Sequence, residues 1–164
     1  MKRGFEKISF SQFCNDIVDD KNLYEEYKLP SRSTFHSAGY DFFAIQDIVI
    51  KPGETVKIPT GVKAYMDFDE MLMLIVRSST GFKYNVRLTN QVGIIDSDYY
   101  NNESNEGHIW ISLQNHGDSE FVIKKGEACI QGIFTKFLST DDDNLIKKER
   151  KGGFGSTNRR DENE

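Results

Sequence analysis

Short apolar runs separated by turn residues fill the middle of this 164-residue chain. From Ala38 onward the runs recur at intervals of roughly ten residues, a spacing typical of short strands and their turns. The predicted strands lie within residues 40–50, 55–59, 62–66, 71–76, 108–114, 121–123 and 128–138. Many short strands at even spacing indicate an all-β fold, either a barrel or a double-sheet jelly roll.

The first thirty residues have a different pattern. Residues 4–9 favour a short edge strand, and apolar residues at helical spacing follow at Phe10, Phe13, Cys14 and Ile17. Ser9 and Gln12 resemble a capping box at the start of this helix. A second short helix is expected around Leu23, Tyr24 and Tyr27, ending near Pro30. We therefore predict a partly helical N-terminal insertion over residues 10–29.

The end of the chain is polar and rich in arginine, glycine and serine. Such a segment cannot form a core of its own, so it is either a flexible solubilising tail or an arm that orders on a ligand. Glycines beside Phe154 let the backbone wrap closely around a ligand, and an aromatic ring stacks on a base with about 1–3 kcal/mol. We divide the chain into one domain over residues 1–138 and a linker with a flexible C-terminal arm over 139–164.

Composition narrows the classes of function. The net charge of -5 argues against nucleic acid as the main partner, although a few local cations suffice for one phosphorylated small molecule. Cys14 and Cys129 lie far apart and fit thiols of a reducing compartment. The N-terminus lacks the apolar run of a signal peptide, and no stretch approaches the roughly 18 apolar residues of a membrane span. We expect a cytoplasmic protein with no membrane partner.

The segment from Thr89 to Tyr100 carries the strongest chemical signal. Its apolar residues Val92, Ile94 and Ile95 favour a buried strand, whereas the three residues from Asp96 to Asp98 favour a turn. The break places the Asp96 carboxylate at the edge of a sheet, beside aromatic rings. Such a carboxylate can activate water or hold a metal. The plain alternative is a hairpin turn with solvated acids.

A second chemical signal follows the apolar run 71–76. Arg77-Ser78-Ser79 places one guanidinium and two hydroxyls at the end of a predicted strand, a combination that binds phosphate well.

Five segments in this order resemble the five motifs of the homotrimeric dUTPase family. The resemblance covers about residues 30–158, and the long loop 101–108 resembles dUTPases of Gram-positive bacteria and their phages. The five segments are Ala38–Ala44, Arg77–Ser79, Gly93–Tyr99, Gly126–Gln131 and Arg150–Thr157. The resemblance implies a distorted jelly-roll barrel that forms a homotrimer with active sites at the subunit interfaces.

The resemblance also implies a reaction, the hydrolysis of dUTP to dUMP and pyrophosphate with Mg²⁺ held by the triphosphate and waters. This reaction would limit uracil in DNA and supply dUMP for thymidylate synthesis. Asp96 is then the base that activates water, and Asp41 supports the site. The implied substrate-binding residues are Arg77, Ser78, Ser79 and Gln131 for phosphate, Asn90, Gly93 and Ile95 for uracil, Tyr99 for deoxyribose, and Arg150, Phe154, Gly155 and Ser156 of the arm.

Two alternatives stay open. One is a dCTP deaminase of the same fold, although that chemistry favours a glutamate near the third motif where this chain has Asp96-Ser97-Asp98-Tyr99. The other is a nucleotide-gated module that binds a regulatory protein through residues 10–29 or the loop 101–107. We interpret His36, His108 and His116 as non-catalytic and Trp110 as a core residue.

Overall fold

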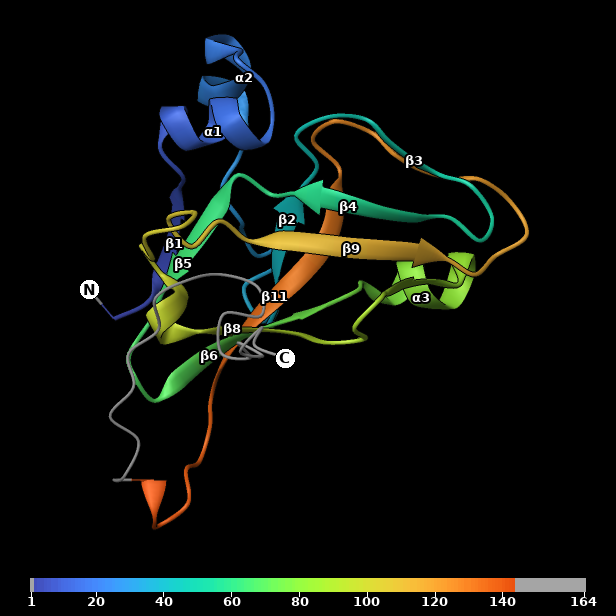
Figure 1. Cartoon of the computed structure of the whole chain (residues 1–164). Helices are drawn as coiled ribbons and strands as arrows, with labels where there is room; N and C mark the ends of the chain where they lie inside the picture. The colour runs from blue at the N-terminus through green and yellow to red at the C-terminus, as the bar shows by residue number, and fades with distance from the viewer. Residues whose placement is uncertain (1, 144–164) are drawn as a thin grey trace, which may run out of the picture.

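The computed structural model describes residues 2–143 of the chain. These residues form eleven strands, three α-helices and one 3-10 turn (Figure 1). The predicted arm residues Arg150, Phe154, Gly155 and Ser156 lie outside the described residues. The strands are β1 (Gly4–Lys7), β2 (Tyr40–Phe43), β3 (Ile48–Ile50), β4 (Thr55–Pro59), β5 (Val62–Tyr65), β6 (Glu70–Ile75), β7 (Val86–Leu88), β8 (Gly93–Asp96), β9 (Trp110–Asn115), β10 (Phe121–Ile123) and β11 (Ala128–Lys136).

The strands pair in small antiparallel sheets that wrap around one core, the distorted jelly roll that the sequence predicts. The largest sheet has the order β2-β11-β6-β8, and the second has the order β4-β9-β7. Two further pairs, β1-β5 and β10-β3, complete the body of the protein. The core lies between the sheets and contains Phe42, Leu72, Leu74, Ile109, Leu113 and Ile130, each almost fully buried.

Strand β11 contains a bulge that sets the direction of its side chains. Ala128 pairs with Phe43 and Ile130 with Phe42, so Cys129 is the extra residue. The bulge buries both Cys129 and Ile130, which a regular alternation would send to opposite faces. Beyond the bulge, Gln131 pairs with Asp41. Both cysteines are free thiols, and burial raises the pKa of the Cys129 thiol to about 12.

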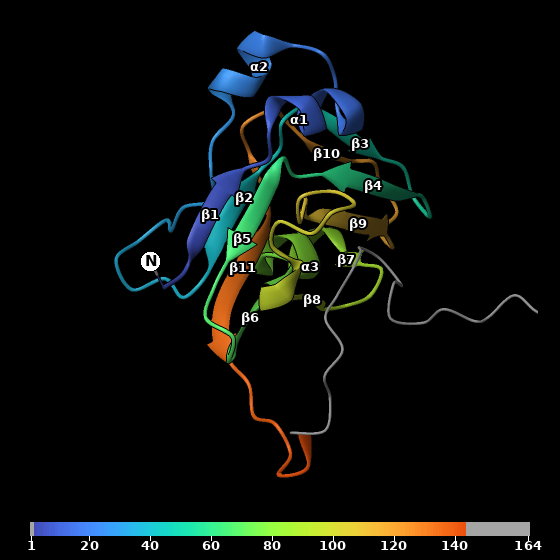
Figure 2. The same ribbon diagram turned by 60° about the vertical axis from the view of Figure 1, so that its left-hand side comes forward.

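The N-terminal insertion has the predicted helices, α1 (Phe10–Asp16) and α2 (Lys21–Glu26). Ser9 caps α1 by accepting a hydrogen bond from the Gln12 backbone N–H. The helices pack at one end of the sheets around a second core cluster, in which the rings of Phe13 and Tyr27 stack with centroids 5.5 Å apart (Figures 1 and 2). Residues 137–143 leave the body at the opposite end.

Several sequence expectations are corrected by the structure. Ser78 and Ser79, predicted at the end of a strand, lie in the first turn of a helix, α3 (Ser78–Tyr84). Strand β7 was not predicted. Val92 precedes β8 instead of lying in it, and 41% of its surface is exposed. Ile94 is in β8 but is 48% exposed because side chains alternate along the strand, with Gly93 and Ile95 facing inward and Ile94 outward. Within residues 2–143, no helix is long and apolar enough to span a membrane.

Candidate active site

Three of the resembling segments meet at a small polar cavity of about 270 Å³. Strand β2 supplies Asp41, the start of α3 supplies Ser78 and Ser79 directly after Arg77, and β11 supplies Gln131. Because β11 lies between β2 and β6, the strand order brings these distant parts of the chain to one place. The cavity is completed by Ser33, Ser37 and Gly39.

Asp41 is the hub of this cavity. Its side chain is largely buried, and Oδ1 lies 3.2 Å from the Arg77 Nε. The Ser33 hydroxyl donates to Asp41 Oδ2 at 2.6 Å. A carboxylate can accept about four hydrogen bonds, so these two contacts leave acceptor capacity on Asp41. The arrangement engages the Nε edge of the guanidinium and leaves the other two nitrogens of Arg77, whose side chain is 40% exposed, available for a phosphate.

Gly39 permits the close approach of the Gln131 side chain. A β-carbon at position 39 would lie 2.2 Å from Gln131 Oε1, so any larger residue would displace the amide. Gln131 Nε2 donates to the Val76 carbonyl at 3.3 Å, which holds the amide beside the loop that leads into α3. Gln131 therefore both satisfies a backbone carbonyl and lines the cavity.

The third segment lies on the other edge of the same sheet. Strand β8 pairs with β6 in a register that places Gly93 opposite Leu74 and Asp96 opposite Met71. Gly93 is buried against Leu74, with 3.2 Å between the Leu74 β-carbon and the position a Gly93 β-carbon would take. Ile95 packs partly against the core, and Asp96 is exposed at the end of the strand. The predicted strand break at Asp96 is confirmed.

Tyr99 lies in the 3-10 turn after β8 and is only 6% exposed. Its hydroxyl donates to the His108 carbonyl at 3.1 Å and accepts from Asn105 Nδ2 at 2.8 Å. The phenol end of the ring is thereby fixed to the following loop. Asn101, just after this turn, adopts the left-handed conformation with φ 55°, which asparagine tolerates better than most residues.

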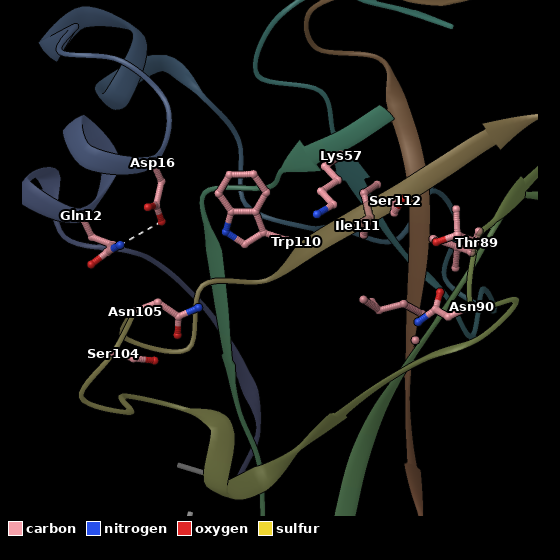
Figure 3. Close-up of a pocket in the computed structure, with 13 residues that line it drawn as sticks. Gln12, Asp16, Lys57, Thr89, Asn90, Ser104, Asn105, Trp110, Ile111 and Ser112 are labelled. Atoms are coloured by element: carbon pink, nitrogen blue, oxygen red, sulfur yellow. Dashed lines mark hydrogen bonds between the residues drawn. The ribbon is translucent and has the colours of Figure 1, made fainter. Parts of the chain in front are cut away.

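A larger cavity of about 600 Å³ borders the third segment (Figure 3). Asn90 and Gly93 line it on one side, and α1 contributes Gln12 and Asp16 on the other. Trp110 lies between these two groups in Figure 3 and is only partly buried, so the expectation of a core tryptophan is wrong. The cavity is lined by polar side chains and by the ring of Trp110. This combination suits a planar base, which can pack on a ring and form hydrogen bonds at its edges.

Asp96 and the phosphate-type cavity do not meet within one chain. Met71, opposite Asp96, is six residues before Arg77 on the same strand and its continuation. At a rise of about 3.3 Å per residue, the two ends are roughly 20 Å apart. The described chain therefore presents two part-sites. One belongs to the third segment, with Asp96 at the end of β8 and with Asn90 and Gly93 at the larger cavity. The other is the small cavity with Asp41, Arg77 and Gln131.

Comparison with known proteins identifies the family. A family model described as dUTPase matches residues 25–158. The chain belongs to the dUTPase family. A deoxyuridine 5'-triphosphate nucleotidohydrolase of Lactococcus lactis is 52% identical over 156 residues, covering 94% of this chain and 97% of that protein. One from Pseudomonas fluorescens is 38% identical and covers 83% of this chain and 91% of that protein.

Solved dUTPase structures share the fold. The dUTPase from Streptococcus mutans is 44% identical, covers 84% of this chain and 98% of that chain, and superposes with a TM-score of 0.68. A mutant dUTPase from phage phi11 of S. aureus, described with a structural Mg(II) ion, has a TM-score of 0.65 at 18% identity and covers 92% of this chain and 98% of that chain. The family resemblance predicted from the motifs is thus confirmed, and the jelly-roll dUTPase fold with it.

The prediction from sequence did not include two serines that line the phosphate-type cavity. Ser33 and Ser37 line it and precede the first motif. The signal was present as a run of hydroxyl residues, Ser31, Ser33, Thr34 and Ser37. None of these has a spacing that marks a motif, so only the contact between Ser33 and Asp41 shows that one of them belongs to the site.

Proposed function

We propose that this dUTPase hydrolyses dUTP to dUMP and pyrophosphate, with Asp96 as the base that activates a water for attack on the α-phosphorus. The observation that carries the proposal is the convergence of Asp41, Arg77, Ser78, Ser79 and Gln131 on one small polar cavity in a chain of this family. Their guanidinium, hydroxyl and amide donors suit phosphate oxygens. General base catalysis of this kind contributes about 10²–10⁴ in rate.

Uracil recognition is proposed for the edge of the larger cavity. Asn90 and the backbone at Gly93 and Ile95 would read the base, because a strand edge presents alternating donors and acceptors. Cytosine would leave a buried group unpaired, which costs more than a lost apolar contact. Tyr99 would pack against the deoxyribose where a ribose 2′-hydroxyl would clash, and the arm residues Arg150, Phe154, Gly155 and Ser156 would cover the bound nucleotide.

The separation of the two part-sites supports a homotrimer. A single triphosphate cannot touch Asp96 and Arg77 of one chain if these lie about 20 Å apart. Completing the site with the Arg77 part of a second copy solves this problem. The exposed Val92 and Ile94 at the edge strand β8 offer apolar surface for such a contact. We propose that three copies assemble, with each site shared between chains.

Magnesium fits this site through Asp41. Two contacts leave its carboxylate with acceptor capacity for metal-bound waters, while the substrate triphosphate would hold the ion itself. When bound, Mg²⁺ neutralises charge on the triphosphate. Among the described residues a second acidic group, Asp67, Asp69 and Glu70, lies elsewhere, and Lys136 and Arg3 pair with its last two members.

The alternatives are less favoured. The relatives named above are nucleotidohydrolases of a deoxyuridine triphosphate, which favours hydrolysis over deamination of dCTP and over a purely protein-binding role. The expectation of a cytoplasmic location stays a proposal, supported by the two free cysteines.

The decisive test measures pyrophosphate release from dUTP, UTP, dTTP and dCTP, together with ammonia release from dCTP. We expect strong selectivity for dUTP and its loss on truncation after residue 149. Asp96→Asn should abolish hydrolysis while dUTP binding stays within about tenfold, because the amide keeps the shape but cannot take a proton. Asp118→Asn, in the exposed bend between β9 and β10, is the matched control. Turnover that survives Asp96→Asn would show that another group is the base.

A further inference from the structure

The N-terminal insertion is bonded to the loop that follows the third motif. Helix α1 and its cap lie beside residues 101–108, although more than ninety positions separate them in sequence. Two acidic contacts make this junction, one at Asp16 and one at Glu106. Helix α1 also lines the larger cavity opposite Asn90 and Gly93, so the insertion reaches the proposed base pocket (Figure 3).

The first contact is a chain of hydrogen bonds through the buried His108. Gly61 N–H donates to His108 Nε2 at 2.9 Å, so Nε2 is an acceptor and the proton of the neutral ring is on Nδ1. Nδ1 then donates to Asp16 Oδ2 at 2.5 Å, and Gln12 Nε2 donates to the same oxygen at 2.8 Å. The Asp16 carboxylate thus fixes both the tautomer and the orientation of the ring.

The second contact joins the cap of α1 to the loop. Ser9 donates from its backbone N–H at 2.9 Å and from its hydroxyl at 2.5 Å to the two oxygens of Glu106. Lys63 lies 3.7 Å from the same carboxylate. Glu106 has φ 58°, a left-handed conformation that is uncommon outside glycine. The two hydrogen bonds from Ser9 therefore hold Glu106 in a backbone conformation that glutamate rarely adopts.

Both contacts end at Tyr99. The Tyr99 hydroxyl donates to the carbonyl of His108, and Asn105, directly before Glu106, donates to the hydroxyl from its side chain. A shift of His108 or of Glu106 would move the two groups that fix this phenol. Helix α1 is thus connected to the proposed sugar contact, Tyr99, in two ways, one through His108 and one through Glu106 and its neighbour Asn105.

We propose that Asp16 and Ser9 are positioning residues that hold Tyr99 in the orientation that selects deoxyribose over ribose. The inference rests on the proposed function, because it uses the assignment of Tyr99 to the sugar. It gives the insertion 10–29 a role in substrate specificity rather than in catalysis. Asp16 and Ser9 themselves need not touch the nucleotide.

The test uses the full-length protein with Asp16→Ala and Ser9→Ala. Each variant should raise the ratio of UTP to dUTP kcat/KM on the order of tenfold, since small displacements of a positioned group change rates by one to two decades. Each should also speed hydrogen exchange at the backbone amides of residues 102–108 in the free protein. Asp16→Asn keeps an acceptor oxygen for His108 Nδ1 and should restore most of the discrimination. Glu25→Ala, which removes only an exposed pair with Lys21, is the matched control.

The two readouts separate the possible failures. If wild-type protein releases no pyrophosphate from dUTP, the proposed function fails, while hydrogen exchange still tests the link from α1 to the loop. If wild type is selective and both alanine variants keep its UTP to dUTP ratio, the positioning role is wrong. The same conclusion follows if the ratio changes but exchange in residues 102–108 does not, because the effect then does not pass through the loop.

Discussion

Asp96 and Arg77 lie toward opposite ends of the same strand pair, β6 and β8. Asp96 is opposite Met71, and Arg77 follows the far end of β6. A site that needs both residues must therefore take them from different chains. This arrangement can be tested without a structure of the assembly.

We predict that two inactive variants restore activity when they assemble together. Asp96→Asn and Arg77→Ala should each be nearly inactive when expressed alone, whereas co-expressed chains should regain a substantial fraction of wild-type pyrophosphate release. In a mixed trimer, some sites combine the intact Asp96 of one chain with the intact Arg77 of another. Co-expression of Asp96→Asn with Asp96→Asn carrying a second tag is the control and should stay inactive. Absence of complementation in confirmed mixed trimers would place both residues in one site of one chain.

Gly39→Ala should impair substrate binding with little loss of stability. The new methyl would lie 2.2 Å from Gln131 Oε1, and the end of this flexible side chain can swing away. We expect a several-fold higher KM for dUTP and a nearly unchanged melting temperature. Gly81→Ala in α3 is the control, because its methyl would meet Val76 at an ordinary 3.7 Å.

A double-mutant cycle identifies the cause of this effect. If Gly39→Ala acts by displacing the Gln131 amide, it should add little to Gln131→Ala, since neighbouring residues in one contact are not additive. Fully additive losses in kcat/KM would mean that position 39 acts on the site by another route.

Ser33→Ala should make Asp41 less well fixed and so weaken the positioning of the Arg77 guanidinium by Asp41. The hydroxyl of Ser33 donates to Asp41 Oδ2, and a hydrogen bond to a charged group contributes about 1.5–3 kcal/mol. We expect kcat/KM for dUTP to fall about tenfold, which corresponds to roughly 1.4 kcal/mol. Ser31→Ala serves as the control, because Ser31 meets Asp41 only through backbone hydrogen bonds in the described contacts. Equal activities of the two variants would remove Ser33 from the site.

Much of the fold could be predicted from the sequence because the spacing of apolar residues and the positions of turn residues indicate the same elements. The alternation in β9 buries Ile111 and Leu113, and Ser9 caps α1 as its spacing with Gln12 predicts. Helix α3 was not predicted because its serine, threonine and glycine residues are weak helix formers. Two other features stabilise the helix. Thr80 is buried, and Asn85 ends the helix in the left-handed conformation with its backbone N–H donating to the carbonyls of Gly81 and Thr80.

The remaining features depend on contacts that no local pattern records. Asp16 and His108 are 92 residues apart, and only the folded chain brings them to 2.5 Å. Ile94 has the apolar character of a core residue and yet faces outward, because the alternation along β8 gives the inward positions to Gly93 and Ile95. The sequence therefore names candidate site residues, but it does not show that they divide into two part-sites at different places on one sheet.

His108 should make the protein less stable as the pH falls below about 6.5, the ordinary histidine value. Burial lowers the pKa of His108 in the folded protein, although Asp16 and then Glu106 act in the opposite direction. A histidine with a lowered pKa binds a proton more readily when unfolded, so protons favour unfolding between pH 6.5 and the lower folded value. The contribution of His108 to the free energy of unfolding should fall by up to about 1.4 kcal/mol per pH unit in this window and level off below it.

Urea unfolding between pH 7.5 and 5 measures this slope. His108→Gln should remove most of it, even if the variant is less stable at every pH, because the slope counts protons and not contacts. The exposed His36 provides the control, and His36→Gln should keep the wild-type slope. The carboxylates with lowered pKa, such as Asp47 and Glu70, take up protons mainly below pH 5 even in the unfolded chain, so the upper part of this range reports His108. A free energy of unfolding that stays constant from pH 7.5 to 5 in wild type would show that His108 takes up its proton as easily in the fold as in the unfolded chain.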